Sequence, residues 1–230
     1  MICIPIMARN NTEALKKMAK AAPLADMIEV RLDVMEAFDV GEIVQAAPGP
    51  VIVTYRSRKE GGSGSADYKT QIGYLLKAIE VGADFVDVEY SLPLELRQRI
   101  FESRGGSKLI ISSHLLNGTP PRERLEDVFR KMAATGADVV KIITLATRPE
   151  DNLSVLGLIP PARELDVKII AFCMGPLGRI SRITTLLTGG YLTFASLEEG
   201  QESASGQIPV REMKNMLEML SCGIKITGTK

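Results

Sequence analysis

The chain has few of the residues that build metal centres and disulfide-linked folds. Its 230 residues contain one histidine and three cysteines, Cys3, Cys173 and Cys222. No Cys/His spacing typical of zinc is present, and one imidazole without a clustered acidic motif argues against any metal site. Cysteines that are odd in number and scattered, two of them in apolar strand-like runs, indicate core packing and a reducing cytoplasm rather than disulfides.

Two other features are absent from the sequence: an excess of one charge and a long apolar run. The 28 basic and 28 acidic side chains balance, so the composition gives no reason to expect nucleic acid or another polyanion as a partner. No segment approaches the roughly 18 apolar residues that a membrane-spanning helix needs, and no charged-then-apolar signal peptide opens the chain. We therefore expect a cytoplasmic protein that binds neither nucleic acid nor a membrane.

What the sequence does contain is a repeated alternation of short, β-branched apolar runs with longer amphipathic segments. The apolar runs predict strands over residues 2–6, 27–32, 51–56, 85–89, 109–113, 139–143, 168–173 and 191–195. The amphipathic segments predict helices over residues 12–22, 40–46, 68–81, 94–103, 121–135, 149–165, 178–187 and 207–220.

The eight strand–helix units predict an α/β fold. They favour a single (β/α)8 barrel, or TIM barrel, over an open doubly wound sheet. No Gly-x-Gly-x-x-Gly follows the first predicted strand, which argues against dinucleotide binding. Since no linker or break in composition interrupts the chain, residues 1–230 are predicted to form one domain. In such barrels the functional site forms at the carboxyl ends of the strands, so polar residues there become the candidates.

The strongest candidate is Lys141, which lies within the apolar run of residues 137–143. Lysine is rarely buried, because removing its ammonium from water is unfavourable unless it finds a partner or loses its proton. The segment alone leaves two explanations open. One is a buried ion pair, for which Asp87 and Glu89 are available; the other is an amine kept partly neutral to form a Schiff base. His114, the only histidine, ends another apolar run and favours the catalytic explanation.

Further polar residues fall at the same predicted rim. Glu29 and Arg31 lie two apart on one strand and share a face. The others end or follow predicted strands: Arg56, Arg182, Ser203 and Gln207. Arginines at one rim suit a carboxylate or a phosphate, because the planar guanidinium binds such groups through two hydrogen bonds. Structural alternatives stay open, such as an internal Glu29–Arg31 salt bridge or a solvated Arg182 at a helix end, but convergence on one rim favours catalysis.

Six segments, taken in order, resemble the type I 3-dehydroquinate dehydratases, the Schiff-base-forming hydro-lyases of the shikimate pathway. They are residues 29–33, 54–62, 112–114 with 119–120, 136–141, 174–182 and 203–207. The resemblance implies a role in aromatic amino acid biosynthesis, the conversion of 3-dehydroquinate to 3-dehydroshikimate through a lysine imine. Two positions depart from the family: Ser205 stands where proline is more frequent, and Pro5 where some relatives offer a serine to the substrate.

The resemblance also implies a role for each candidate. Lys141 is similar to the lysine that attacks the C3 ketone, His114 to the general base and acid, and Glu60 to the carboxylate that orients this histidine. The positions similar to substrate-binding residues are Glu29, Arg31, Arg56, Arg182, Ser203 and Gln207, with Arg182 as partner of the substrate carboxylate. An iminium at C3 acidifies the C2 proton, so we expect neither a metal nor a cofactor.

Other expectations concern the loops, the oligomer and two competing functions. The loops over residues 58–67 and 200–206 are candidate lids, although surface disorder explains their composition equally well. A homodimer is expected, because dimers are the commonest oligomers of soluble enzymes.

Two competing functions stay open. A class I aldolase shares the lysine and the fold but would need a phosphate nest after the last strands, whereas Gly189 and Gly190 precede the eighth predicted strand. A non-catalytic barrel that binds a small acid, with Lys141 in an ion pair, is the second rival.

Overall fold

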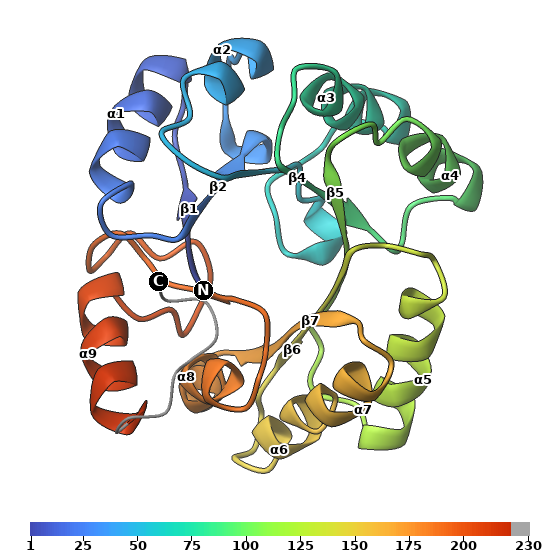
Figure 1. The fold of residues 1–230 in the computed structure, drawn as a ribbon, viewed down its shortest axis with the longest axis vertical. Coiled ribbons are helices and arrows are strands. Elements are labelled where there is room, and N and C mark those ends of the chain that lie inside the picture. Colours follow the sequence, from blue (N-terminus) through green and yellow to red (C-terminus); the bar gives the residue numbers. More distant parts are fainter. Residues whose placement is uncertain (222–230) are drawn as a thin grey trace.

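In a computed structural model of the chain, which describes residues 1–221, eight parallel strands curl into a barrel surrounded by helices (Figure 1). Neighbouring strands follow the order β7-β6-β5-β4-β3-β2-β1-β8. The strands are β1 (Ile2–Ile6), β2 (Met27–Arg31), β3 (Val51–Thr54), β4 (Phe85–Glu89), β5 (Lys108–Leu115), β6 (Val139–Leu145), β7 (Lys168–Met174) and β8 (Thr193–Phe194). The predicted (β/α)8 barrel is therefore confirmed, and each predicted strand coincides with an observed one.

The barrel is nearly closed, and its weakest seam lies at the last strand. β8 pairs with β1 over two residue pairs. On the other side, the amide of Tyr191 donates a backbone hydrogen bond of 2.7 Å to Ile169 of β7. The predicted strand over residues 191–195 is reduced to Thr193–Phe194, because its first amide turns toward β7 while the amides of Thr193 and Ala195 turn toward β1.

The helices lie outside the strands, and one predicted helix is wrong. They are α1 (Asn11–Ala21), α2 (Val40–Gln45), α3 (Tyr68–Glu80), α4 (Leu94–Glu102), α5 (Arg122–Ala133), α6 (Asp151–Leu156), α7 (Ile159–Glu164), α8 (Arg179–Leu187) and α9 (Val210–Ser221), with 3-10 turns η1 (Leu32–Val34), η2 (Arg58–Glu60) and η3 (Pro176–Gly178). The single helix predicted over residues 149–165 is two helices, α6 and α7. Pro160 and Pro161 open α7. Because proline has no amide hydrogen and its ring clashes with the carbonyl four residues before it, Pro160 cannot continue α6.

The interior of the barrel changes from apolar to polar along the strands. Successive side chains of a strand point to opposite faces, so every second residue points inward. Near the amino ends, inward residues form an apolar cluster that includes Cys3, Met27, Ile52, Phe85, Ile110, Val139 and Ile170. Two residues further along, the buried side chains are polar: Glu29, Thr54, Asp87, Ser112 and Lys141. The barrel thus has an apolar floor and a polar upper half at the carboxyl ends of its strands.

A larger apolar core lies between the outer face of the strands and the helices, with Val30, Val53, Leu75 and Phe129 among its members. Cys173 also belongs to this core and Cys3 to the barrel floor, so both cysteines fill core space as predicted, and both are free thiols. Cys222 lies outside the described residues.

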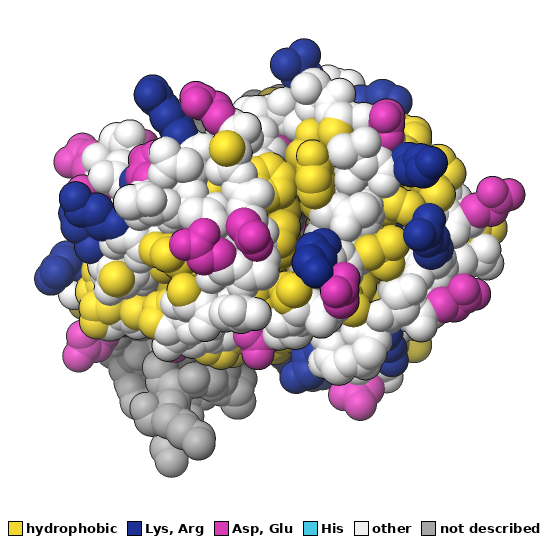
Figure 2. Space-filling view, turned by 90° about the horizontal axis from the view of Figure 1, so that it is seen from above, with side chains coloured by type: hydrophobic (Ala, Val, Ile, Leu, Met, Phe, Trp, Pro, Cys, Tyr) yellow, Lys and Arg dark blue, Asp and Glu magenta, His cyan; other side chains and the backbone are white. Residues whose placement is uncertain are grey.

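The surface carries both charges. On the face shown in Figure 2, basic and acidic side chains are interspersed, with apolar side chains between them. Within residues 1–221, no helix has the length and apolar character needed to cross a membrane.

Candidate active site

A pocket of about 70 Å³ lies at the carboxyl end of the barrel. All nine predicted site residues line it: Glu29, Arg31, Arg56, Glu60, His114, Lys141, Arg182, Ser203 and Gln207. Apolar side chains complete its wall, namely Ile143, Phe172, Met174 and Phe194. Residues far apart in the sequence meet here because parallel strands bring their carboxyl ends to one rim of the barrel.

Lys141 points into the barrel from the middle of β6, and the residue is 4% exposed. Its Nζ lies 3.0 Å from Oδ2 of Asp87 and 3.5 Å from Oε1 of Glu29. On another side, Nζ lies 4.4 Å from the centre of the Phe194 ring, a favourable cation–π arrangement. The buried ion pair that the sequence left open is therefore present, and it lies inside the pocket.

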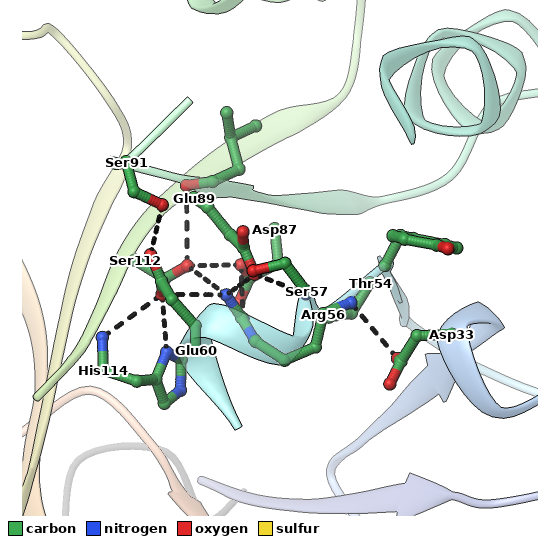
Figure 3. Close-up of polar contacts among 12 residues, drawn as sticks. Asp33, Thr54, Arg56, Ser57, Glu60, Asp87, Glu89, Ser91, Ser112 and His114 are labelled. Atoms are coloured by element: carbon green, nitrogen blue, oxygen red, sulfur yellow. Dashed lines mark hydrogen bonds and ion pairs between the residues drawn. The ribbon is translucent and has the colours of Figure 1, made fainter. Parts of the chain in front are cut away.

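Arg56 is the centre of a buried charge cluster (Figure 3). It shares its partner Asp87 with Lys141. Its Nη2 donates to Oδ1 of Asp87 at 2.7 Å, while its Nη1 donates to Oε1 of Glu89 at 3.1 Å and to the Ser112 hydroxyl at 2.9 Å. Burial alone would lower the pKa of Arg56, but these carboxylates raise it above its usual range. Burial would likewise raise the pKa of Asp87, yet Arg56 and Lys141 hold it well below its ordinary value.

Arg31, at the end of β2, pairs with Asp33 rather than with Glu29. Its Nε donates to Oδ1 of Asp33 at 2.7 Å and its Nη2 to Oδ2 at 2.8 Å. Asp33 also accepts hydrogen bonds from the backbone amides of Arg56 and Ser63, so it connects three segments of the rim. Burial would raise the pKa of Asp33, but the hydrogen bonds from Arg31 and from these amides lower it. Among the described residues, the internal Glu29–Arg31 salt bridge considered from the sequence is not formed.

Glu60 and His114 form a hydrogen-bonded pair at the edge of the pocket (Figure 3). Oε2 of Glu60 lies 3.1 Å from Nδ1 of His114 and accepts from the His114 backbone amide at 3.2 Å. Burial raises the pKa of Glu60 to about 7, although the charge of Arg56 opposes this. Burial, together with the cations Arg56 and Lys141, lowers the pKa of His114 well below its ordinary value. At neutral pH the imidazole is therefore uncharged, and in the tautomer whose Nδ1–H donates to Glu60, Nε2 is the nitrogen that can accept a proton.

Arg182, on the first turn of α8, is 1% exposed and has no carboxylate partner among the described residues. Its Nη2 donates to the carbonyl of Ser205 at 3.1 Å, its guanidinium carbon lies 4.6 Å from the centre of the Phe172 ring, and its Nε has no hydrogen-bond partner. Burial lowers the pKa of Arg182 to about 10. A buried, unpaired guanidinium is unfavourable until an anion reaches it, so this position can receive a carboxylate or a phosphate. The alternative of a solvated helix-end arginine is wrong.

The segment that carries Ser203 and Gln207 is held in place by its own hydrogen bonds. The amide of Ser203 donates to Oε1 of Gln207 at 2.8 Å, and Nε2 of Gln207 donates to the Ser203 hydroxyl at 3.0 Å. Gly206 has a φ of +82°, and a Cβ there would lie 2.3 Å from the carbonyl oxygen of Gly175. Only glycine permits this close approach, which fastens the loop after β8 to the loop after β7.

The first half of the 58–67 loop is an ordered turn that presents Glu60. The amide of Arg58 donates to the carbonyl of Gly64, and the amide of Gly62 donates to that of Ser57. A Cβ at Gly62 would lie 2.2 Å from the carbonyl oxygen of Arg56, so this glycine is needed for the turn to fold against the end of β3. The composition that looked compatible with disorder therefore serves close packing here, whereas movement of either loop as a lid stays a prediction.

Sequence reasoning missed several groups that organise the site. It offered Asp87 and Glu89 as balance for Lys141, but Glu89 pairs with Arg56 instead. It gave no role to Asp33, Ser91 and Ser112. Period-two alternation along β5 could have found Ser112, since it lies two residues before His114. Asp33 lies in the 3-10 turn η1 and Ser91 in the turn after β4, and neither segment is long enough for a periodic signal to assign a direction.

Comparisons with known proteins agree with this geometry. A model of the type I 3-dehydroquinase family matches residues 2–223. The chain is 36% identical over 222 residues to the 3-dehydroquinate dehydratase of Methanococcus maripaludis strain C5, covering 96% of this chain and 100% of that protein. It is 34% identical over 229 residues to the chloroplastic bifunctional 3-dehydroquinate dehydratase/shikimate dehydrogenase of Arabidopsis thaliana, covering 97% of this chain but 38% of that longer protein.

Solved structures lead to the same family. The crystal structure of 3-dehydroquinate dehydratase from Geobacillus kaustophilus superposes with a TM-score of 0.88 at 28% sequence identity. The superposition covers 97% of this chain and 92% of that one. Since a family model matches nearly the whole length and the fold agrees, the chain belongs to the type I 3-dehydroquinase family.

Proposed function

We propose that Lys141, His114 and Glu60 carry out the chemistry of this chain, which as a type I 3-dehydroquinase removes water from 3-dehydroquinate to give 3-dehydroshikimate. One observation supports these roles most strongly: the amine of Lys141, the uncharged imidazole of His114 and the unpaired guanidinium of Arg182 meet in one pocket. An imine-forming elimination needs these three kinds of group, as nucleophile, proton carrier and anchor for the substrate carboxylate.

The reaction begins at Lys141. After releasing a proton, Nζ attacks the C3 ketone carbon of the substrate, and loss of the ketone oxygen as water leaves a covalent iminium. Asp87 and Glu29, at 3.0 and 3.5 Å from Nζ, counter the positive charge that the nitrogen carries in the resting ammonium and again in the iminium. The iminium withdraws electrons from C2 and so makes the C2 proton easier to remove.

His114 then moves the proton. Its Nε2 takes the C2 proton, and the electron pair left behind forms an enamine with the lysine nitrogen. The enamine expels the C1 hydroxyl, to which His114 returns the proton, so that a second water leaves. Glu60 stabilises the imidazolium that exists between the two transfers, because its carboxylate lies beside Nδ1. Addition of water to the product imine restores the amine, and the net change is the loss of one water.

Substrate orientation is proposed for the polar groups around the reacting atoms. Arg182 binds the substrate carboxylate, since its Nε is buried without a partner and its charge is unpaired. Hydroxyl groups of the substrate are expected to contact Glu29, Arg31, Arg56, Ser203 and Gln207, which line the same pocket. Arg56 differs from Arg182, because its guanidinium already donates to several protein groups. Arg56 therefore offers the substrate only part of its guanidinium, not two free parallel donors.

We further propose a cytoplasmic homodimer that binds neither nucleic acid nor a membrane. Free, buried cysteines, the balance of 28 basic and 28 acidic side chains, and their interspersed arrangement in Figure 2 support the location and the lack of a polyanionic partner. Leu153, Leu177 and Ile180, which are exposed on the neighbouring elements α6, η3 and α8, support a surface that a second subunit covers. Light scattering tests the dimer, and the mass of one chain would contradict it.

The activity is tested by absorbance of the conjugated enone product with 3-dehydroquinate as substrate. Borohydride is then added with substrate, and peptide mass spectrometry locates the reduced adduct. We expect turnover and an adduct at Lys141, with neither in Lys141→Ala and both in Lys131→Ala, which removes an exposed lysine. An adduct formed only with sugar phosphates would favour the aldolase, and no adduct with either substrate would favour the non-catalytic barrel.

A further inference from the structure

Ser91 touches the proposed catalytic machinery from its outer side. It lies in the turn after β4, and its hydroxyl donates to Oε1 of Glu60 at 2.6 Å (Figure 3). Ser91 itself is exposed, whereas the side chain of Glu60 is 7% exposed. Ser91 does not line the pocket, so it has no direct access to a bound substrate. Any effect of Ser91 on the reaction must therefore pass through Glu60.

The two oxygens of Glu60 have different surroundings. Oε2 accepts from the His114 amide at 3.2 Å and from Nη1 of Arg56 at 3.4 Å, and it faces Nδ1 of His114 at 3.1 Å. Among the described residues, the hydroxyl of Ser91 is the hydrogen-bond partner of Oε1. When Nδ1 of His114 carries its hydrogen, the groups around Oε2 are all donors, so a proton taken up by Glu60 settles on Oε1. Ser91 thus faces the oxygen at which the charge of Glu60 is decided.

The charge of Glu60 is poised near neutral pH. Burial, followed by the charges of Glu89 and Asp87, raises its pKa. The charge of Arg56 and the hydrogen bond from Ser91 lower it, and the net result is a pKa of about 7. Glu60 and His114 lie beside each other, and the other charged groups that face them from the surrounding elements are Arg31, Arg56, Asp87, Glu89 and Lys141. Because this pKa lies near neutral pH, the loss of one hydrogen bond to the ionised form changes the fraction of Glu60 that is charged.

We propose that Ser91 is a positioning residue, whose hydroxyl keeps Glu60 ionised and thereby keeps His114 in the tautomer with hydrogen on Nδ1 and a free Nε2. The inference rests on the proposed function of His114 as the base. With Glu60 ionised, Nδ1–H donates to Oε2 and the imidazolium formed during turnover has a counter-charge. With Glu60 protonated, that counter-charge is lost, and Nε2 becomes a poorer base.

Two substitutions at one position isolate the hydroxyl. Ser91→Thr keeps the donor, whereas Ser91→Val has nearly the same shape as threonine but offers no hydrogen bond to Oε1. In the pH profile of kcat, the acid limb of Ser91→Val should lie about one pH unit above that of Ser91→Thr, since hydrogen bonds to charged groups are worth about that much. At pH values well below the acid limb, kcat of Ser91→Val should be about tenfold lower than kcat of Ser91→Thr, while KM and the borohydride adduct are retained. Ser91 is exposed, so we expect both variants to fold.

A spectroscopic readout does not depend on turnover. His114 is the only histidine, so ¹⁵N spectra of the tag-free protein report a single imidazole. The pH at which its ring-nitrogen shifts respond to Glu60 should be higher in Ser91→Val than in Ser91→Thr, again by about one unit. Superposed profiles and spectra for the two variants would overturn the inference, as would a loss of kcat that is equal at every pH. If the unaltered protein neither turns over 3-dehydroquinate nor forms the adduct, the proposed function fails, while the spectra still decide the link from Ser91 to His114.

Discussion

Replacing Arg182 with methionine should separate stability from function. The guanidinium is buried and has no carboxylate partner among the described residues, and its Nε lacks any hydrogen bond. Methionine preserves much of the apolar stem, which packs in the wall of the pocket, and removes the charge. In the absence of substrate, the protein loses a buried cation that nothing neutralises. In its presence, it loses the proposed anchor of the substrate carboxylate.

The magnitude follows from the pKa and the contacts of Arg182. Lowering of its pKa from about 12.5 to about 10 corresponds to about 3 kcal/mol of unfavourable free energy for the charged form in the folded state. Removing the side chain forfeits the hydrogen bond to Ser205 and the contact with the Phe172 ring, together about 1–3 kcal/mol. The free energy of unfolding of Arg182→Met should therefore be unchanged or higher by up to about 2 kcal/mol. Truncating one partner of a buried charge pair typically costs 2 kcal/mol or more, so kcat/KM should fall at least about 30-fold.

Urea unfolding without ligand measures the first quantity, and the enone absorbance assay measures the second. Arg179→Met serves as the matched control, because Arg179 is an exposed arginine on the same helix and does not line the pocket. It should alter both quantities little. An unliganded Arg182→Met protein that is less stable by more than about 2 kcal/mol would refute the reasoning, since Arg182 would then have a stabilising partner. Near-normal kcat/KM would remove Arg182 from the carboxylate role.

Three further predictions follow from the same contacts. His114→Ala should keep the borohydride adduct at Lys141 but lose at least about 10²-fold in turnover, because no second histidine can replace the proton carrier; normal turnover would make His114 structural. The pKa of Glu60 is about 7 in the folded state and 4.5 in the unfolded state. Between pH 4.5 and pH 7 the folded state therefore binds more protons than the unfolded state, so the contribution of Glu60 to stability falls as the pH rises through this range. The unfolding free energy of Glu60→Gln relative to the unaltered protein should therefore rise by up to about 3 kcal/mol from pH 4.5 to 7, and a flat difference would contradict the pKa shift. Chelators should leave turnover unchanged, because the iminium supplies the electron sink; recovery of lost activity by a divalent ion would contradict this.

Hydrophobic patterning accounts for the parts of the structure that could be predicted from the sequence. Apolar runs located the strands, and residues two apart on one run predicted that Glu29 and Arg31 share the inner face. The order of strands around the barrel then brings Lys141 and His114 together, since β5 and β6 are neighbours. Pro160 lies inside a segment whose amphipathic pattern continues on both sides, so that pattern concealed the break between α6 and α7.

The partners of the site residues could not be predicted in the same way. Glu29, two residues away, was the obvious partner of Arg31 in the sequence. Arg31 pairs with Asp33 instead, because η1 turns the Asp33 carboxylate toward both Nε and Nη2 of the guanidinium. Ser91 lies in a turn after β4, and its contact with Glu60 joins two segments that are 31 residues apart in the sequence. Choices among nearby acids depend on differences of an ångström or two. These are set by tertiary packing, not by periodicity.

The polar upper half of the barrel is therefore a region that the rest of the fold must support. Buried ion pairs such as those of Arg56 and Lys141 contribute little net stability, because desolvation offsets their attraction. The apolar floor and the core under the helices supply the hydrophobic driving force instead. Arg182 is the exception within the polar half, since its charge stays uncompensated until an anion enters. Substrate binding would then relieve an unfavourable interaction that the empty site retains, which couples recognition of the carboxylate to the stability of the whole barrel.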